Sequence, residues 1–182
     1  MHRTVLPLSL IMLAACGLSL LAQTTATPST TSAAQQVYAD MNQLMRGVLY
    51  PAANVVFASQ LENAGEVKLP PGVDPNMSTD PLTSTFGGWT AIENAALALA
   101  ESSNLLLIPD RKCANGVVPP TKDPAWLAFV EELRGASMKA YEAAKAKSDT
   151  EKMFAISDVV AKSCSGCHRR FRDRRGAGTR CT

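Results

Sequence analysis

Three residues near the C-terminus have the types and spacing to bind a cofactor covalently. Cys164, Cys167 and His168 form the pattern Cys-x-x-Cys-His, by which haem is attached to a chain. Because residues three and four apart share one face of a helix, all three side chains can address one flat ligand. The two thiols would form thioether bonds with the haem vinyl groups, and the imidazole would ligate the iron. The pattern therefore predicts a single covalent haem c.

Other sites also use a pair of cysteines, and the chain fits them less well. A structural zinc ion needs four Cys or His ligands, and only Cys113 and Cys181 remain to complete a set with the pair. A redox dithiol is expected at a helix N-terminus after a strand, whereas no strand is predicted here. An iron–sulfur cluster needs four thiolates at another spacing. An exported zinc domain stays open as an alternative.

The N-terminal residues predict export. A basic start and an apolar run over residues 5–15, short for a membrane span, predict a signal peptide over 1–22. The box Leu-Ala-Ala-Cys that ends at Cys16 resembles a bacterial lipobox, in which this cysteine would be lipidated; ordinary cleavage within 22–26 is the alternative. Residues 23–34 are rich in Thr, Ser and Ala and are predicted to form a flexible leader. We therefore expect a periplasmic protein, free or tethered to a membrane by lipid.

Export also bears on the haem and on the remaining cysteines. Haem c is attached outside the cytoplasm, so the destination suits the motif, and nucleic acid is not an expected partner. Once Cys16 leaves with the leader and two cysteines bind haem, Cys113 and Cys181 are an even remainder in an oxidising compartment. The prediction is a disulfide between them, with two free thiols as the alternative.

Composition and periodicity predict one all-α domain over residues 35–182. The chain has 182 residues, enough for one core, and aromatic residues make up only 5% of it. Apolar residues recur at helical spacing over four segments, about 32–61 with a kink at Pro51, 89–108, 123–147 and 148–171. Two long connections and one tight turn join these segments, which fits an antiparallel four-helix bundle.

Local signals predict the helix ends and the buried faces. Asp123 before Pro124 predicts the start of the third helix, with Gly135 as a weak point inside it. Ser148 with Glu151 three residues later matches a capping box at the start of the fourth. The expected buried stripes include Val37, Met41, Leu44, Met45 and Val48 in the first helix, Trp126, Phe129, Val130, Leu133, Met138 and Tyr141 in the third, and Met153, Phe154, Ile156, Val160 and Phe171 in the fourth. The motif continues the last stripe, so the haem is expected between the helices.

The residues from Cys164 to Arg172 also carry a resemblance to a known family. Their order, Cys-Ser-Gly-Cys-His-Arg-Arg-Phe-Arg, is similar to the C-terminal Cys-x-x-Cys-His-x-x-Phe-Arg pattern of class II c-type cytochromes, the cytochrome c-prime type of four-helix bundle. The Leu44-Met45 segment also matches, whereas the long loops and the tail over 174–182 depart from the compact family pattern. The resemblance implies one of two functions: electron transfer with a Met from the first helix on the iron, or binding of NO or CO at a five-coordinate iron.

The sequence limits the choice of the second axial ligand. His2 leaves with the signal peptide, so His168 is the only histidine of the mature chain, and a pair of His ligands is excluded. The resemblance places the distal residue on the first helix, where we choose Met45, with Met41 in reserve. A methionine on an apolar helical face is often only core filler, which is the competing interpretation. His/Met ligation would raise the reduction potential relative to His alone, and it predicts an electron carrier.

Charge near the motif indicates the kind of partner. Seven of the 18 lysines and arginines lie from Lys162 onward, against the single acid Asp173. This basic end would steer a redox partner with an acidic docking face, and Arg172 is our candidate for binding a haem propionate; a solvated basic tail is the alternative. The cytochrome c maturation machinery is a further expected partner, and the resemblance implies a homodimer through the first two helices. With one histidine and no catalytic constellation, no enzyme is predicted.

Overall fold

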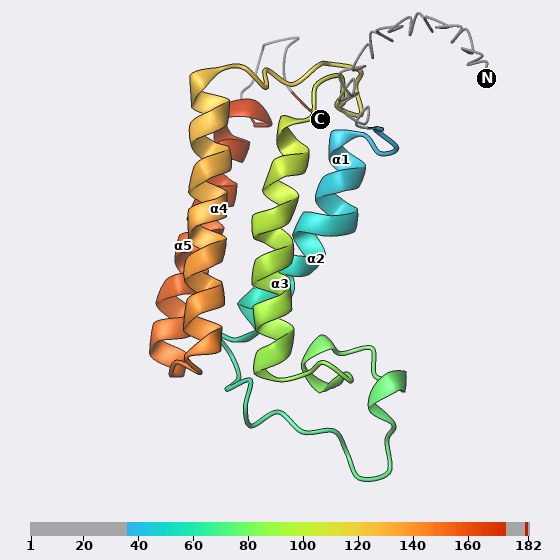
Figure 1. Ribbon diagram of the computed structural model, residues 1–182, viewed down its shortest axis with the longest axis vertical. Coiled ribbons are helices and arrows are strands. Elements are labelled where there is room, and N and C mark those ends of the chain that lie inside the picture. The colour runs from blue at the N-terminus through green and yellow to red at the C-terminus, as the bar shows by residue number, and fades with distance from the viewer. Residues whose placement is uncertain (1–35, 174–180, 182) are drawn as a thin grey trace, which may run out of the picture. The chain divides into compact units, whose positions relative to one another are not determined.

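The computed structural model describes residues 36–173 and 181, which belong to one unit of the chain, Gln35–Thr182 (Figure 1). The predicted signal peptide, the lipobox at Cys16 and the leader over 23–34 lie outside the described residues. So do three of the basic residues near the C-terminus, Arg174, Arg175 and Arg180. Every regular element within the described part of the chain is helical, which confirms the all-α prediction. None of the helices described is long and apolar enough to cross a membrane.

Four helical segments lie along one another (Figure 1). The first is continuous and comprises α1 (Met41–Leu44), the π-helical turn η1 (Met45–Leu49) and α2 (Tyr50–Ala58). The others are α3 (Trp89–Ser102), extended by the 3-10 helix η4 (Ser103–Leu107), α4 (Pro124–Lys145) and α5 (Thr150–Phe171). The long connection from the first segment to α3 holds two short 3-10 turns, η2 (Pro75–Met77) and η3 (Pro81–Thr83).

The first helix begins later than predicted. Residues 36–40 are not helical, and α1 starts at Met41, not near residue 32. The reason is a reciprocal capping box: the Asp40 carboxylate accepts a hydrogen bond from the Gln43 backbone N–H at 2.7 Å, and the Gln43 side chain accepts one from the Asp40 N–H at 2.9 Å. These bonds satisfy amides that the helix itself leaves unpaired, which defines the start of the helix at this point.

The interruption predicted at Pro51 takes the form of a π turn in the residues that precede it. Proline has no N–H to donate to the carbonyl of Gly47, and its ring crowds that carbonyl. The backbone hydrogen bonds before Pro51 therefore span five residues in place of four: the Tyr50 N–H donates to the carbonyl of Met45. The helix thus continues past Pro51 by taking up one extra residue per turn locally.

This extra residue rotates the buried face of the first segment. Met41 and Leu44 are buried as predicted, but within the π turn Leu49 is buried and Val48 is 37% exposed. The stripe prediction was therefore wrong at Val48, because it assumed an uninterrupted period of 3.6 residues. It was also wrong at Val37, which is 37% exposed and precedes the start of the helix.

The starts of α4 and α5 both follow local signals, but the cap of α5 differs from the prediction. α4 begins as predicted, since the Asp123 side chain accepts from the Ala125 N–H at 2.7 Å with Pro124 in the first position. The cap of α5 is Asp149, whose carboxylate accepts from the Lys152 N–H at 2.8 Å, and not Ser148. Ser148 instead belongs to the end of α4, because its N–H donates to the Ala143 carbonyl at 3.0 Å, the bond that closes a helix C-terminus.

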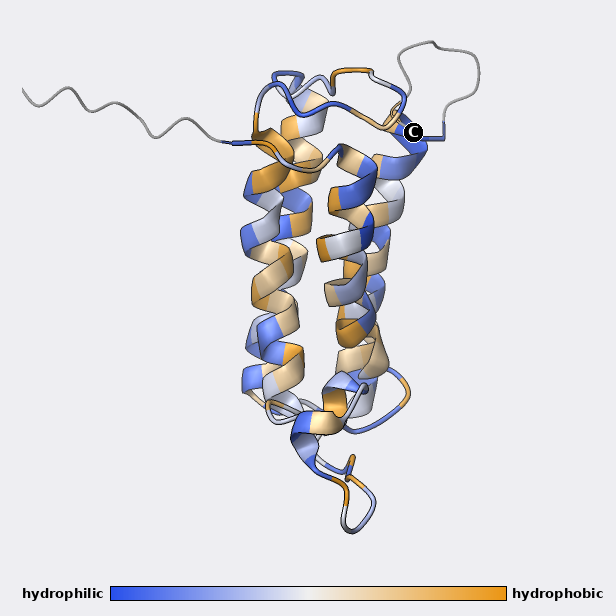
Figure 2. Cartoon of the chain, turned by 90° about the vertical axis from the view of Figure 1, so that its right-hand side faces the viewer, coloured by the Kyte–Doolittle hydropathy of each residue, from blue (hydrophilic) through white to orange (hydrophobic). Residues whose placement is uncertain are grey.

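The core is built mainly from small side chains. Ala96 of α3 and Ala140 of α4 are fully buried together with Val56 and Val160, and small residues let helices approach closely. Figure 2 shows hydrophobic and hydrophilic residues interspersed along the helices. α4 runs unbroken through Gly135, contrary to the predicted weak point. The predicted core residues Met138 and Phe154 are 38% and 58% exposed, because alanines occupy the buried face of α4 and Met153 that of α5.

Candidate functional site

A cavity of about 620 Å³ lies between the helices, toward the end of the domain where α4 begins and α5 finishes. Its volume is within the range of roughly 300–1,000 Å³ that is usual for small-molecule and cofactor sites. Apolar side chains from every helical segment dominate its wall, among them Leu49, Ala53, Leu99, Leu106, Val130 and Leu133. The space is therefore suited to a large, mainly apolar ligand.

The three motif residues line this cavity from one side. Cys164, Cys167 and His168 lie in the last two turns of α5, and all are half-buried. Both cysteines are free thiols. The spacing of three and four residues places them on one helical face, as the sequence predicts. One flat ligand in the cavity can thus contact both thiols and the imidazole.

Burial keeps the two thiols protonated. Desolvation raises the pKa of Cys164 and raises the pKa of Cys167 to about 11, and repulsion from Cys164 and Glu132 adds to the shift of Cys167. The thiolate is the form that exchanges with disulfides, and it is scarce here near neutral pH. Both sulfurs therefore keep the hydrogen that addition to a vinyl group would require.

The surroundings of His168 favour its neutral form. Burial lowers the pKa of the imidazole, and the nearby positive charge of Arg172 lowers it further, with Asp173 acting in the opposite direction. A neutral imidazole has a free lone pair on one nitrogen, which is the form that binds a metal. His168 is thus prepared to act as a ligand at neutral pH.

Two methionines from the first helical segment line the same cavity. Met41 of α1 is buried, and Met45, the first residue of the π turn, is half-buried. A thioether sulfur is a soft ligand suited to haem iron. π turns occur frequently at functional sites, and this one begins at a candidate ligand. The structure therefore brings both candidates for the sixth position to the cavity that holds His168.

Charged side chains gather at the rim of the cavity. Arg46, Arg169 and Arg172 all line it, and the Arg172 Nε lies 2.7 Å from a carboxylate oxygen of Asp173. The predicted propionate residue is therefore at the rim and already faces a carboxylate. Arg46 was missed by the sequence reasoning, although its position directly after Met45 was a usable signal.

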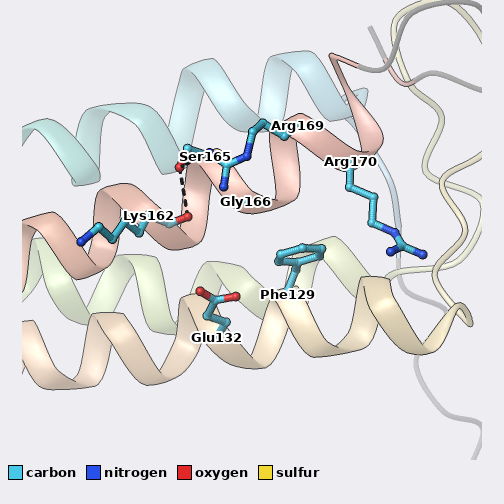
Figure 3. A pocket seen from close by; sticks show the side chains of 7 residues that line it. All are labelled: Phe129, Glu132, Lys162, Ser165, Gly166, Arg169 and Arg170. Carbon is cyan, nitrogen blue, oxygen red and sulfur yellow. Dashed lines mark hydrogen bonds between the residues drawn. The ribbon is translucent and has the colours of Figure 1, made fainter.

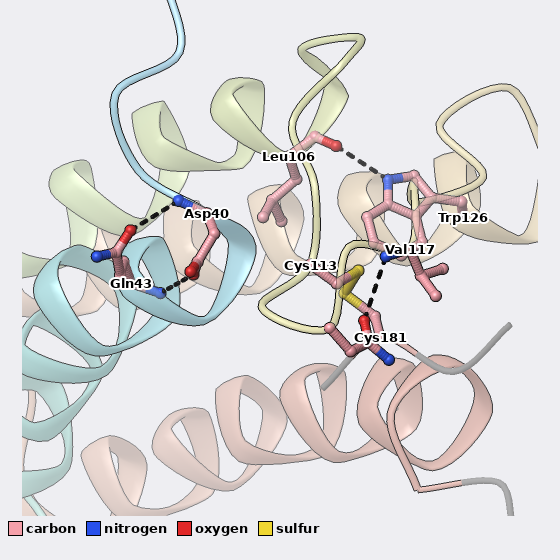
Figure 4. The surroundings of a disulfide bond; sticks show 8 residues. Asp40, Gln43, Leu106, Cys113, Val117, Trp126 and Cys181 are labelled. Atoms are coloured by element: carbon pink, nitrogen blue, oxygen red, sulfur yellow. Dashed lines mark hydrogen bonds between the residues drawn. A yellow bond between two sulfur atoms is a disulfide. The ribbon is translucent and has the colours of Figure 1, made fainter. Parts of the chain in front are cut away.

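Two aromatic rings and a disulfide-bonded cysteine also line the cavity. Figure 4 shows the surroundings of the disulfide. Trp126 and Phe171 line it with their rings edge to face, 4.9 Å apart, and the Trp126 indole N–H donates to the Leu106 carbonyl at 3.1 Å. Cys113 and Cys181, the pair that the sequence predicts to be bridged, are joined by a disulfide with a Cα–Cα distance of 5.1 Å. Because Cys181 itself lines the cavity, a residue outside the helices contributes to this wall.

A second, open groove runs between α4 and α5 on the outer side of the motif (Figure 3). Three cations, Lys162, Arg169 and Arg170, line it against one acid, Glu132. Gly166, between the two motif cysteines, lies so close to the Phe129 ring that a Cβ would come within 3.0 Å of it. Phe129, Ser165 and Arg169 line both the groove and the cavity, so only these side chains and α5 separate the two.

The same geometry weakens the zinc alternative. Cys113 and Cys181 are bonded to each other, and they are the residues that would have completed a set of four ligands. Among the residues that the structure describes, no three Cys, His, Asp or Glu side chains lie close enough to hold a metal ion together.

No protein-family model, curated protein or solved structure matches the chain. Its function is therefore inferred from the residues of this site.

Proposed function

We propose that the chain is an exported monohaem cytochrome of the class II c type, an antiparallel four-helix bundle that transfers electrons through a His/Met-ligated haem. One observation carries the proposal. One apolar cavity of cofactor size is lined by Cys164, Cys167 and His168 of α5 and by Met41 and Met45 of the first helical segment. A covalent haem with two protein ligands on its iron uses both cysteines, the histidine and one of the two methionines.

The two thiols would hold the group covalently. Each thiol would add across one vinyl group of the haem, with the sulfur bonding to one vinyl carbon and the thiol hydrogen passing to the other. This addition consumes no oxidant or reductant, and the raised pKa values of Cys164 and Cys167 keep both hydrogens in place beforehand. The tether leaves His168, one residue further along α5, to approach the iron.

The iron ligands would come from two different helical segments, α5 and the first segment. His168 offers a neutral nitrogen, and Met45, with Met41 in reserve, offers a sulfur. When bound, haem supplies a one-electron Fe(III)/Fe(II) couple. The chain tunes that couple through the methionine ligand and through an apolar lining that excludes water, both of which raise the reduction potential.

Charge at the rim would serve both the cofactor and the partner. Arg46, Arg169 and Arg172 are placed to offset the two haem propionates. Lys162, Arg169 and Arg170 of the outer groove add positive charge where α5 separates groove and cavity, which favours a periplasmic redox partner with an acidic face.

Attachment of the haem requires the cytochrome c maturation machinery, and a lipid at Cys16 would tether the protein to a membrane. A homodimer formed through the first helical segment and α3 is a further part of the proposal.

Covalent haem is the first quantity to measure. We expect the protein, produced in the periplasm together with a cytochrome c maturation system, to stain for haem on a denaturing gel. The double variant Cys164→Ser/Cys167→Ser should lose the stain, whereas Cys113→Ser should retain it. Wild-type protein that folds but carries no haem under these conditions would overturn the proposal.

A further inference from the structure

The short segment Arg111–Cys113, between η4 and α4, contacts both of the elements that would supply iron ligands. It follows Asp110, which has a left-handed backbone conformation (φ 67°) that turns the chain back toward the domain. The Arg111 side chain is buried, with 5% of its surface exposed, although it is charged. A guanidinium is rarely buried unless its donors are satisfied, so its partners indicate its role.

On one side, the segment holds the start of α1. Arg111 Nη1 donates to the Ala39 carbonyl at 2.5 Å, and its Nε donates to the Leu105 carbonyl at 3.3 Å. The carbonyl of Lys112 accepts a hydrogen bond from the Met41 backbone N–H at 2.8 Å. Three bonds thus join the methionine-bearing end of the first segment to the end of η4.

On the other side, the segment holds the end of α5. Cys113 is buried and is joined to Cys181 by the disulfide, and the Cys181 N–H donates to the carbonyl of Phe171 at 3.0 Å. Phe171 is the last residue of α5 and stands three residues after His168. A continuous chain of covalent and hydrogen bonds therefore runs from the backbone of Met41 to the last turn of α5.

We propose that Arg111–Cys113 and Cys181 form a clasp that sets the separation between the two methionines and His168, and that Arg111 is its positioning residue. The inference rests on the proposed function. The other end of the first segment continues into the long connection to α3, so among the described residues the chain links its methionine-bearing end to the other helices through that distant end. The clasp supplies a restraint at the cavity through the Arg111 side chain, two backbone hydrogen bonds and the disulfide, and it supplies no ligand to the iron.

Two readouts on the purified, full-length protein test the clasp. The first is amide hydrogen exchange, which does not depend on haem. Arg111→Met should accelerate exchange at the backbone amide of Met41 and its neighbours in α1 at least tenfold, while amides in the middle of α4 near Ala140 stay unchanged. The second is the charge-transfer band of ferric haem that reports a methionine sulfur on the iron. The same variant should weaken this band and speed CO binding to the reduced protein at least tenfold.

Matched variants separate positioning from general damage. Lys112→Met removes a neighbouring, exposed charge but leaves the backbone bond to Met41, so it should behave as wild type. Arg111→Lys keeps a cation able to reach one carbonyl and should restore part of the band. Cys113→Ser/Cys181→Ser cuts the other half of the clasp and should reproduce the effect of Arg111→Met, which keeps the test decisive if either variant fails to fold.

The outcomes are distinct from those of the haem test. Normal exchange in α1 in a folded Arg111→Met or Cys113→Ser/Cys181→Ser variant overturns the clasp. Faster exchange with an unchanged band and unchanged CO binding overturns its role in placing the ligand. A wild-type protein without covalent haem instead overturns the proposed function, and with it the positioning role, whatever the exchange rates are.

Discussion

Single residues decide which chemistry the cavity can perform. The half-buried thiols of Cys164 and Cys167 are held protonated, and the pKa of His168 is lowered so that its imidazole is neutral. Burial has opposite effects on the two pKa values because it disfavours whichever form is charged, the thiolate in one case and the imidazolium in the other. The same desolvation would therefore prepare the two thiols and the imidazole for the roles that the proposed haem site gives them.

The two thioether bonds can be tested one at a time. We expect Cys164→Ser or Cys167→Ser alone to retain haem on a denaturing gel, because one covalent bond is enough to resist denaturation. One vinyl group then stays conjugated with the ring and moves the visible band of the reduced protein to longer wavelength. An absorption spectrum of each reduced variant measures this shift. A single variant with the wild-type spectrum would show that the replaced cysteine makes no thioether.

The choice between the two methionines is a second prediction at this scale. Met45→Ala should abolish the charge-transfer band of the ferric protein, lower the reduction potential, and let CO bind the reduced protein at least ten times faster, because the sixth position opens. Met138→Ala is the matched control, since Met138 is 38% exposed and does not line the cavity. Loss of the band in Met41→Ala but not in Met45→Ala would transfer the role to Met41. A wild-type protein without the band, with rapid CO binding, would favour the five-coordinate, gas-binding alternative.

The helices bring these residues together, and their ends follow local chemistry. The start of α4 was predictable because Asp123 and Pro124 act within one turn. The cap of α5 was misplaced by one residue because Ser148 closes the preceding helix, a bond that depends on how tightly the chain turns there. The π turn shifted the buried face from Val48 to Leu49, because a proline effect spread to the residues before it. An error of one residue in a predicted helix therefore assigns to the core a side chain that lies on the surface.

The packing of α3 gives a stability prediction. Ile92 is fully buried in a cluster at some remove from the cavity, with Met153 of α5. Ile92→Ala should lower the free energy of unfolding by about 2–5 kcal/mol, because it removes apolar contacts and leaves a void. Urea unfolding of the haem-loaded protein measures the change, and the haem spectrum should not alter.

Leu61→Ala is the matched surface control for that experiment. Leu61 is 86% exposed, so its truncation should change the free energy of unfolding by no more than about 0.5 kcal/mol. Equal losses in the two variants would contradict the assignment of Ile92 to the core.

For the molecule as a whole, the disulfide joins parts of the chain that are far apart in sequence. It closes a loop between residues separated by 68 positions, and chain entropy predicts that such a link stabilises the fold by about 4 kcal/mol. Cys113→Ser/Cys181→Ser should lose stability of this order in urea unfolding. Addition of a reductant should destabilise the wild type and leave the variant unaffected, and an equal response of both would argue against the bridge.

Local spacing was sufficient for much of this description. The all-helical fold, the cap at Asp123 and the shared face of the motif residues depend on neighbours within one or two turns, whose interactions are set by the geometry of a helix. The sequence by itself determined these features, and with them the interpretation of the motif as a haem site.

Only the tertiary structure decided which distant residues meet. It placed Met41, Met45 and Arg46 in the wall of the cavity that His168 also lines, buried Arg111 against the start of α1, and brought Cys181 to the cavity wall. These contacts join positions tens of residues apart, and no periodicity in the sequence encodes them. They depend on how closely the alanines let the helices approach and on the paths of the connections between the helices. Both are settled only when all the segments pack together.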